Sequence, residues 1–286
     1  MLSETVWNSN LKELKIDYLY HLGLDNTEDL KGTFKDTRFV CMFGSALRAE
    51  MFAKKAGKQL GFTVEGPIGK TERFSLYKIG PVISVSHGMG MPSLLILLHE
   101  ITKLLQYAEA IDVAYIRIGT CGGVGIEPGT VVITTEAVNE KLEAVFEHME
   151  LGKVRRYITK LDNKLAESIL KSAGDIKAVL GKTMGTDDFY EGQGRLDGAL
   201  QPRYKAEEKM EYLKKAAEIG VLNIEMEATA FATFCSRADI TGAIVDAALL
   251  DRLKVDQIYV GKEELAGFSE KAQQVVLNYI KSKING

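Results

Sequence analysis

The chain has 286 residues, a formal net charge of −3, and a content of 46% hydrophobic and 26% charged residues. These values are typical of a soluble globular protein with enough apolar residues for a sizeable core. Proteins that follow a nucleic-acid backbone need clustered positive charge, and the chain has no long basic stretch, so we expect no nucleic-acid partner.

The cysteines and the N-terminal residues bear on the cellular compartment. Cys41, Cys121 and Cys235 are odd in number and widely spaced, so they predict neither a disulfide framework nor a metal cluster. The N-terminal residues are polar, and the longest apolar run, 94–98, is far too short to span a bilayer. We therefore expect a cytoplasmic protein that does not associate with membranes.

Hydrophobic patterning predicts alternating strands and helices beyond an N-terminal arm at 1–16. Strands are expected at 38–42, 73–78, 82–86, 112–118, 130–135, 178–184 and 242–250. Helices are expected near 46–59, 92–109, 161–173, 205–219, 223–238 and 262–284. The mixed charge of 139–160 indicates an exposed helix and loop. This alternation predicts one α/β domain over 1–286, with a mixed, twisted central sheet covered by helices.

Two strand ends carry features of an anion site. After strand 38–42, Gly44 turns the chain into a helix that bears Arg48, so helix-terminal N–H groups and a guanidinium come together. Strand 112–118 ends near Arg117, beside a glycine-rich turn at 119–123 whose spacing is not that of a dinucleotide-binding loop. An ordinary strand-to-helix connection is the alternative for the first pattern.

A metal site is not expected. His99 and Glu100 begin an HExxH motif, but Lys103 stands where the second histidine would be. Asp246 is a charge among the apolar residues of the predicted strand 242–250 and receives no functional assignment, although a buried carboxylate needs a partner.

The segment 183–198 contains three glycines that break regular structure and allow tight turns. Between them stand Gln193, with an amide acceptor and two donors, and Arg195, with a rigid fork of donors. Together these two side chains are suited to a flat imide with two carbonyls, and Phe189 and Tyr190 offer a stacking face. A glycine-rich surface turn with a solvated arginine is the alternative.

The run FYEGQGRLDGAL at 189–200 resembles the pyrimidine-recognition loop of uridine phosphorylases, in the eukaryotic-type branch of the nucleoside phosphorylase-I family. Three further segments agree with that family: SVSHGMGMPS at 84–93, RIGTCGGVGIEPGTVVIT at 117–134 and NIEMEATAF at 223–231. The resemblance covers nearly the whole chain from about Asp17. It implies a three-layer α/β/α sandwich that catalyses reversible phosphorolysis of uridine to uracil and ribose-1-phosphate in pyrimidine salvage. Orthophosphate would be the co-substrate, and neither a metal nor an organic cofactor is implied.

The resemblance also assigns roles to individual residues. It implies phosphate binding by Gly44, Arg48, Arg73, Arg117 and Thr120. It implies substrate binding by His21, Phe189, Gln193, Arg195, Met226, Glu227 and Arg252. Catalysis falls to Gln193 and Arg195, which stabilise charge on the base, and to Glu227, which binds the ribose diol. Glu225 is a second, weaker candidate for binding the ribose diol. In the family's homodimer, the residues matching His21 and Arg73 serve the partner subunit's site.

Asp251 departs from the pattern of the family's uridine-specific members, which usually carry Asn before the arginine at this point. Purine-specific members place a catalytic aspartate at about this position. A purine nucleoside phosphorylase or nucleosidase on the same fold is therefore one alternative. A non-catalytic nucleoside-binding protein is the other, and the presence of Arg48, Arg73 and Arg117 argues against it.

Overall fold

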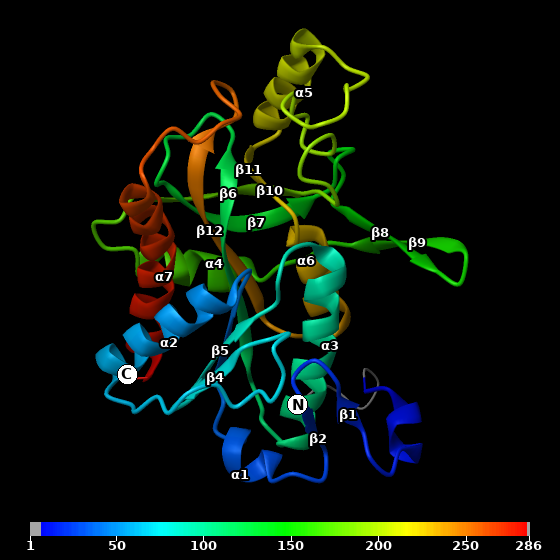
Figure 1. The fold of residues 1–286 in the computed structure, drawn as a ribbon, viewed down its shortest axis with the longest axis vertical. Coiled ribbons are helices and arrows are strands. Elements are labelled where there is room, and N and C mark those ends of the chain that lie inside the picture. Colours follow the sequence, from blue (N-terminus) through cyan, green and yellow to red (C-terminus); the bar gives the residue numbers. More distant parts are fainter. Residues whose placement is uncertain (1–6, 285–286) are drawn as a thin grey trace. The chain divides into compact units, whose positions relative to one another are not determined.

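The computed structural model describes residues 7–284 (Figure 1). These residues divide into two compact units. The first unit comprises residues up to 117 together with 234–242, and the second comprises 118–233 with 243–286. Residues 1–6 of the expected N-terminal arm lie outside the described residues. The next part of that arm contains a 3₁₀ helix, η1 (Ser9–Glu13), none of whose side chains is buried.

The first unit is built on strands in the order β6-β3-β5-β4. These are β3 (Phe39–Phe43), β4 (Leu76–Ile79), β5 (Val82–Ser86) and the beginning of β6 (Ala114–Gly123). β3 runs parallel to β5, and β4 runs antiparallel to it. Every residue of β3 and β5 is buried, as expected for parallel strands that are covered on both faces. The unit also contains α1 (Leu30–Phe34), α2 (Ala46–Leu60), α3 (Met91–Tyr107) and the short pair β1 (Tyr18–Leu19) and β2 (Leu24–Asp25).

The second unit contains strands in the order β11-β10-β7-β12-β6, and a further pairing of β11 with β6 closes them into a ring. Besides the end of β6, these are β7 (Val131–Val138), β10 (Ala178–Gly185), β11 (Val221–Glu225) and β12 (Gly242–Asp251). β10 is parallel to β7 and β11, whereas β12 is antiparallel to β7. The helices are α4 (Asn163–Lys171), α5 (Ala206–Glu218), α6 (Ala228–Arg237, which continues into the first unit) and α7 (Lys262–Ile284). The expected mixed α/β class is confirmed.

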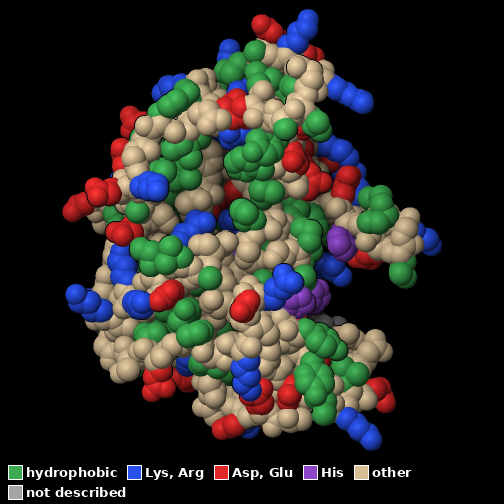
Figure 2. All heavy atoms as spheres, in the orientation of Figure 1, with side chains coloured by type: hydrophobic (Ala, Val, Ile, Leu, Met, Phe, Trp, Pro, Cys, Tyr) green, Lys and Arg blue, Asp and Glu red, His purple; other side chains and the backbone are tan. Residues whose placement is uncertain are grey.

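The expected helix and loop at 139–160 is wrong. This segment forms an antiparallel ribbon of β8 (Val145–Glu150) and β9 (Lys153–Ile158). Its tight turn places Leu151 and Gly152 at φ values of 48° and 78°. The charged residues that favoured a helix instead face one another across the ribbon. Glu147, for example, lies opposite Arg156 and forms an ion pair with it. Figure 2 shows hydrophobic side chains on the ribbon, at the right of the view, standing beside charged ones.

The glycine-rich segment at 119–123 is not a turn, and residues 223–225 do not begin a helix. β6 continues to Gly123 and pairs with β11, with Gly122 opposite Ile224 and Gly123 opposite Asn223. A Cβ at Gly122 would lie 2.9 Å from Arg252 Cγ, so glycine here allows close approach between chain segments instead of a turn. Within the described part of the chain, every helix is too short or too polar to span a bilayer.

Candidate active site

The loop that follows β10 is folded by its own side chains. The carboxylate of Asp188 accepts hydrogen bonds from Tyr190 N at 2.9 Å and Gly192 N at 2.8 Å. Gly194 adopts φ 64°, a conformation that glycine reaches without strain. Tyr204 donates its hydroxyl to the carbonyl of Arg195 at 2.6 Å. The loop therefore has a defined shape that places the side chains of residues 193 and 195.

The amide of Gln193 is held in one orientation. The residue is 4% exposed, and its Nε2 donates to Thr186 Oγ1 at 3.2 Å. Arg252 Nη1 donates to the amide Oε1 at 3.4 Å, and Nη2 donates to the backbone carbonyl of Gln193 at 2.8 Å. The donor and acceptor ends of the amide are thus distinguished by their partners. The amide oxygen and the NH₂ group of Gln193 are therefore oriented before a planar imide binds to them.

Arg195 is also buried, at 9% exposed, so the alternative of a solvated arginine on a surface turn is wrong. Its Nε and Nη2 donate to the two carboxylate oxygens of Asp197 at 2.8 and 2.6 Å. This hydrogen bonding lowers the pKa of Asp197 below its usual value. The guanidinium lies over the ring of Phe189, 4.7 Å from the ring centre, and over Tyr190 at 5.8 Å. The two aromatic rings that the sequence offered as a stacking face therefore pack against Arg195.

Arg252 joins the loop to a buried charge network. It is 1% exposed, and its Nε donates to Asp256 Oδ1 at 2.9 Å, while Lys209 Nζ donates to Asp256 Oδ2 at 2.5 Å. Burial lowers the pKa of Arg252, an effect that Asp256 opposes. Burial alone would raise the pKa of Asp256, but hydrogen bonds from Lys209 and Arg252 outweigh it and lower that pKa. Asp256 thus stays ionised at neutral pH, and it fixes the arginine that orients Gln193.

The ends of β10 and β11 bring the loop beside the first turn of α6. Gly185 and Glu225 are partners in the parallel register, and Thr186 N donates to the carbonyl of Glu225 at 2.9 Å. The Glu225 carboxylate accepts from Glu227 N at 2.9 Å and Ala228 N at 2.6 Å, so it caps the N-terminus of α6. Glu225 is therefore a helix cap. Glu227, at the end of this capped turn, is buried.

The first unit holds the predicted anion site at the start of α2. Ser45 is the N-cap residue, and its Oγ accepts from Arg48 N and Arg48 Nε, both at 3.3 Å. Gly44 sits where a Cβ would lie 3.3 Å from the carbonyl oxygen of Gly88. The two glycines follow the parallel strands β3 and β5, whose carboxyl ends lie side by side. Arg117 is buried on β6, the neighbour of β3.

His21 and Arg73 share one neighbourhood of the first unit. Thr71 Oγ1 donates to the carbonyl of His21 at 2.5 Å and accepts from Arg73 N at 3.2 Å. Arg73 is exposed, and the His21 side chain is 34% exposed. Tyr18 and Tyr20, close by in the chain, are also exposed. The two residues that the resemblance assigns to a partner subunit are thus adjacent at the surface.

The family model described as the phosphorylase superfamily matches residues 38–282. The chain belongs to the phosphorylase superfamily. It is 44% identical to uridine phosphorylase 1 of Mus musculus over 97% of this chain and 92% of that one. Uridine phosphorylase from Schistosoma mansoni, solved in complex with uracil, superposes with a TM-score of 0.93 at 40% identity, over 96% of this chain and 98% of that one. This agreement confirms the expected nucleoside phosphorylase-I fold.

One relative of this chain has a name that describes it as inactive. The protein named inactive uridine phosphorylase B, from Schistosoma mansoni, is 36% identical over 97% of this chain and 96% of that one. Membership of the phosphorylase superfamily is therefore compatible with loss of activity.

Asp251, the departure from the pattern expected in this superfamily, has a structural explanation. Its Oδ1 accepts from Gly125 N at 3.0 Å and from Leu253 N at 3.1 Å, and its Oδ2 lies 3.2 Å from Lys254 Nζ. The carboxylate thereby ties the turn after β6 to the end of β12. Asp251 is engaged with backbone N–H groups, an arrangement that suits a structural anchor.

Asp246 lies in the interior of the second unit, fully buried. Asn223 Nδ2 donates to its Oδ2 at 3.4 Å, and Asn223 in turn accepts from Thr183 Oγ1 at 2.8 Å. Thr183 is also hydrogen-bonded to Thr134 at 2.7 Å. The charge that the sequence left without a role is thus part of a buried polar chain.

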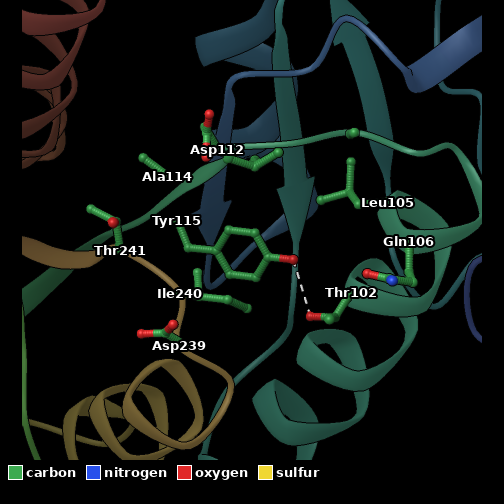
Figure 3. Close-up of a pocket in the computed structure, with 11 residues that line it drawn as sticks. Thr102, Leu105, Gln106, Asp112, Ala114, Tyr115, Asp239, Ile240 and Thr241 are labelled. Atoms are coloured by element: carbon green, nitrogen blue, oxygen red, sulfur yellow. Dashed lines mark hydrogen bonds between the residues drawn. The ribbon is translucent and has the colours of Figure 1, made fainter. Parts of the chain in front are cut away.

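A separate cavity of about 220 Å³ lies in the first unit (Figure 3). Its lining includes Tyr115, whose hydroxyl is hydrogen-bonded to Thr102 Oγ1 at 3.0 Å, and the carboxylates of Asp112 and Asp239. None of the predicted site residues lines it. The cavity is therefore distinct from the predicted nucleoside and phosphate residues.

The sequence interpretation missed Asp197, Lys209 and Asp256, which hold Arg195 and Arg252. Asp197 stands two residues after Arg195, and Asp256 stands four residues after Arg252, so each of these partners is close to its arginine in the sequence. These spacings were available in the sequence. Lys209 approaches from α5, a contact that no local pattern reveals.

Proposed function

We propose that the chain catalyses the reversible phosphorolysis of uridine, yielding uracil and ribose-1-phosphate. The observation that carries this proposal is the buried amide of Gln193, oriented by Thr186 and Arg252 beside the buried Arg195. Uracil presents an imide N–H between two carbonyls, and this pair of side chains offers an acceptor and donors to match it. Membership of the phosphorylase superfamily and the names of the close relatives support the same substrate.

In the proposed reaction, the glycosidic bond stretches toward a cationic sugar while negative charge collects on the base. Gln193 Nε2 and Arg195 stabilise that charge. Asp197 accepts hydrogen bonds from Nε and Nη2 of Arg195. Among the described residues, none accepts a hydrogen bond from Nη1 of Arg195, so this group can donate to the base. Donors that are fixed before the reaction need no reorganisation when charge develops, which makes them effective.

Phosphate would be held beneath the anomeric carbon by residues of the home subunit, namely Gly44, Arg48, Arg117 and Thr120. A partner subunit would add Arg73. This gives the advantage of proximity over a reaction between free molecules. Glu227 would accept hydrogen bonds from the ribose diol while Met226 packs on the sugar. We propose that no metal or organic cofactor takes part.

The chain would act as a homodimer with shared sites, in which His21 and Arg73 complete the partner's site. Support comes from the surface neighbourhood that Thr71 creates by bonding to both residues. We propose that residues 1–286 work as one domain with 1–16 as its arm. Its place would be pyrimidine salvage in the cytoplasm.

A panel of uridine, thymidine and inosine, each assayed with and without phosphate, tests this function. We expect uracil release from uridine only when phosphate is present. Equal release without phosphate would identify a nucleosidase. Absence of release from every nucleoside would favour a non-catalytic nucleoside-binding protein.

Asp251→Asn is expected to change kcat/KM for uridine by less than about five-fold, because Asn keeps an oxygen that can accept from Gly125 N and Leu253 N. The ion pair that it loses, with the exposed Lys254, is worth at most about 1 kcal/mol. Steady-state kinetics with uridine and inosine measure the outcome. Asp251→Ala removes both acceptors and should lower the free energy of unfolding by about 1–3 kcal/mol. If Asp251→Asn abolishes activity and inosine is a good substrate, the purine alternative is correct.

A further inference from the structure

Glu100, part of the HExxH-like sequence that lacks its second histidine, has an unexpected position. It lies on α3 and is buried, with its carboxylate turned to the segment that carries His21. Oε1 lies 2.7 Å from His21 Nδ1, and Oε2 accepts from His21 N at 2.9 Å and Leu22 N at 3.0 Å. One buried carboxylate therefore holds both the backbone and the ring of the histidine.

These contacts determine which ring nitrogen of His21 carries the proton. A carboxylate that already receives two backbone N–H groups acts as an acceptor, so Nδ1 must be the donor. In the neutral imidazole the lone pair then belongs to Nε2. The ring is supported further by the buried Phe74, whose centroid is 5.7 Å away at an interplanar angle of 34°. No described residue forms a hydrogen bond with Nε2, and the side chain is partly exposed.

We propose that Glu100 is a positioning residue that fixes His21 as an Nδ1–H tautomer, so that Nε2 accepts a hydrogen bond from the nucleoside 5′-hydroxyl in the partner's site. This inference rests on the proposed function, which supplies the nucleoside and the shared site. A ring that carries its proton on Nε2 would present a donor to the same hydroxyl. A ring that rotates freely would present no fixed acceptor. Recognition of the 5′-hydroxyl thus depends on a side chain that does not touch the nucleoside.

The kinetic test compares uridine with 5′-deoxyuridine, which lacks the hydroxyl, in Glu100→Gln. Gln replaces one acceptor oxygen with an NH₂ group, so it no longer specifies Nδ1 as the donor. We expect KM for uridine to rise about ten-fold, the typical value of one hydrogen bond, and KM for 5′-deoxyuridine to stay within about two-fold. Glu109→Gln is the control, because Glu109 forms an exposed ion pair with Lys31 just beyond the same helix. Equal rises for both substrates would reduce Glu100 to a structural residue and overturn the proposal.

A spectroscopic measurement keeps the inference testable apart from activity. The chain has four histidines, so the ¹⁵N signals of His21 can be assigned by their loss in His21→Ala. We expect a protonated Nδ1 and an unprotonated Nε2 in the unmodified protein, and a mixture of tautomers in Glu100→Gln. An Nε2–H tautomer in the unmodified protein would overturn the proposal even if uridine is cleaved. If the unmodified protein cleaves no nucleoside, the proposed function fails, and calorimetric binding of uridine against 5′-deoxyuridine then tests the role of Glu100.

Discussion

Arg195→Ala is expected to lower kcat/KM for uridine by about 10²–10³, the usual loss when one preorganised donor to a developing anion is removed. The guanidinium is buried, locked to Asp197 and packed over Phe189, so no rearrangement is needed to present its remaining N–H groups to the base. We expect most of the loss in kcat, because the interaction strengthens as charge moves onto the base. Steady-state kinetics with uridine at saturating phosphate measure it.

Arg203→Ala is the matched control, since Arg203 is an exposed arginine eight positions further along the same segment. Its removal should leave kcat/KM within about two-fold, as is typical of exposed charges away from the site. Arg195→Lys retains the charge and loses the fork, so it should restore little of the activity. A loss of less than about ten-fold for Arg195→Ala would show that this side chain does not stabilise the base.

Mixing two inactive variants is expected to restore activity if the sites are shared. Arg73→Ala removes a phosphate ligand lent to the partner, and Glu227→Ala removes the ribose grip of the home site. In a mixed dimer, one site has both defects and the other has neither, so activity should return to about half of wild type per mixed dimer. Subunit exchange is verified by mass before the assay.

The control for this experiment mixes Arg73→Ala with His21→Ala. Both are residues that we propose are lent to the partner, so each site of the mixed dimer still lacks one of them. That mixture should show no more activity than His21→Ala shows alone, because no site of the mixed dimer has both residues. If verified exchange between Arg73→Ala and Glu227→Ala restores nothing, Arg73 serves its own subunit and the shared site is wrong.

The alternating strands and helices were predictable because their apolar residues recur at the spacing of buried elements. β5 and α7 begin and end where the patterning placed them. The β8–β9 ribbon was not predictable in the same way, because it is exposed and its charges pair across strands instead of along a helix. Periodicity reports burial, so an exposed ribbon leaves a weak signal.

The glycine-rich segment 119–123 was wrongly predicted to be a turn, because its glycines are needed for close packing between strands. Gly122 and Gly123 lie within β6, where a side chain would collide with Arg252 and with the carbonyl oxygen of Leu250. The contacts with Arg252 and Leu250 come from β12 and the residue after it, more than a hundred positions away in the chain, although Ile126 also lies close to Gly123. Sequence spacing cannot show a contact of this kind.

The candidate site was predictable residue by residue from motifs, but its support was not. Gln193 and Arg195 stood out because their loop has a distinctive composition. The roles of Glu225 as a helix cap, Asp251 as a backbone anchor and Glu100 as the partner of His21 depend on contacts between distant segments. Each of these buried carboxylates accepts backbone N–H groups, an interaction that side-chain identity alone does not specify.

Phosphorolysis consumes phosphate, so the most direct test of the proposed reaction follows the phosphate. Uridine and orthophosphate are incubated with the unmodified protein, and the reaction is followed by ³¹P nuclear magnetic resonance together with uracil release. We expect one orthophosphate to disappear and one ribose-1-phosphate to appear for each uracil formed, and the reaction to run backward from uracil and ribose-1-phosphate. Release of uracil with free ribose, while the orthophosphate signal stays constant, would contradict it.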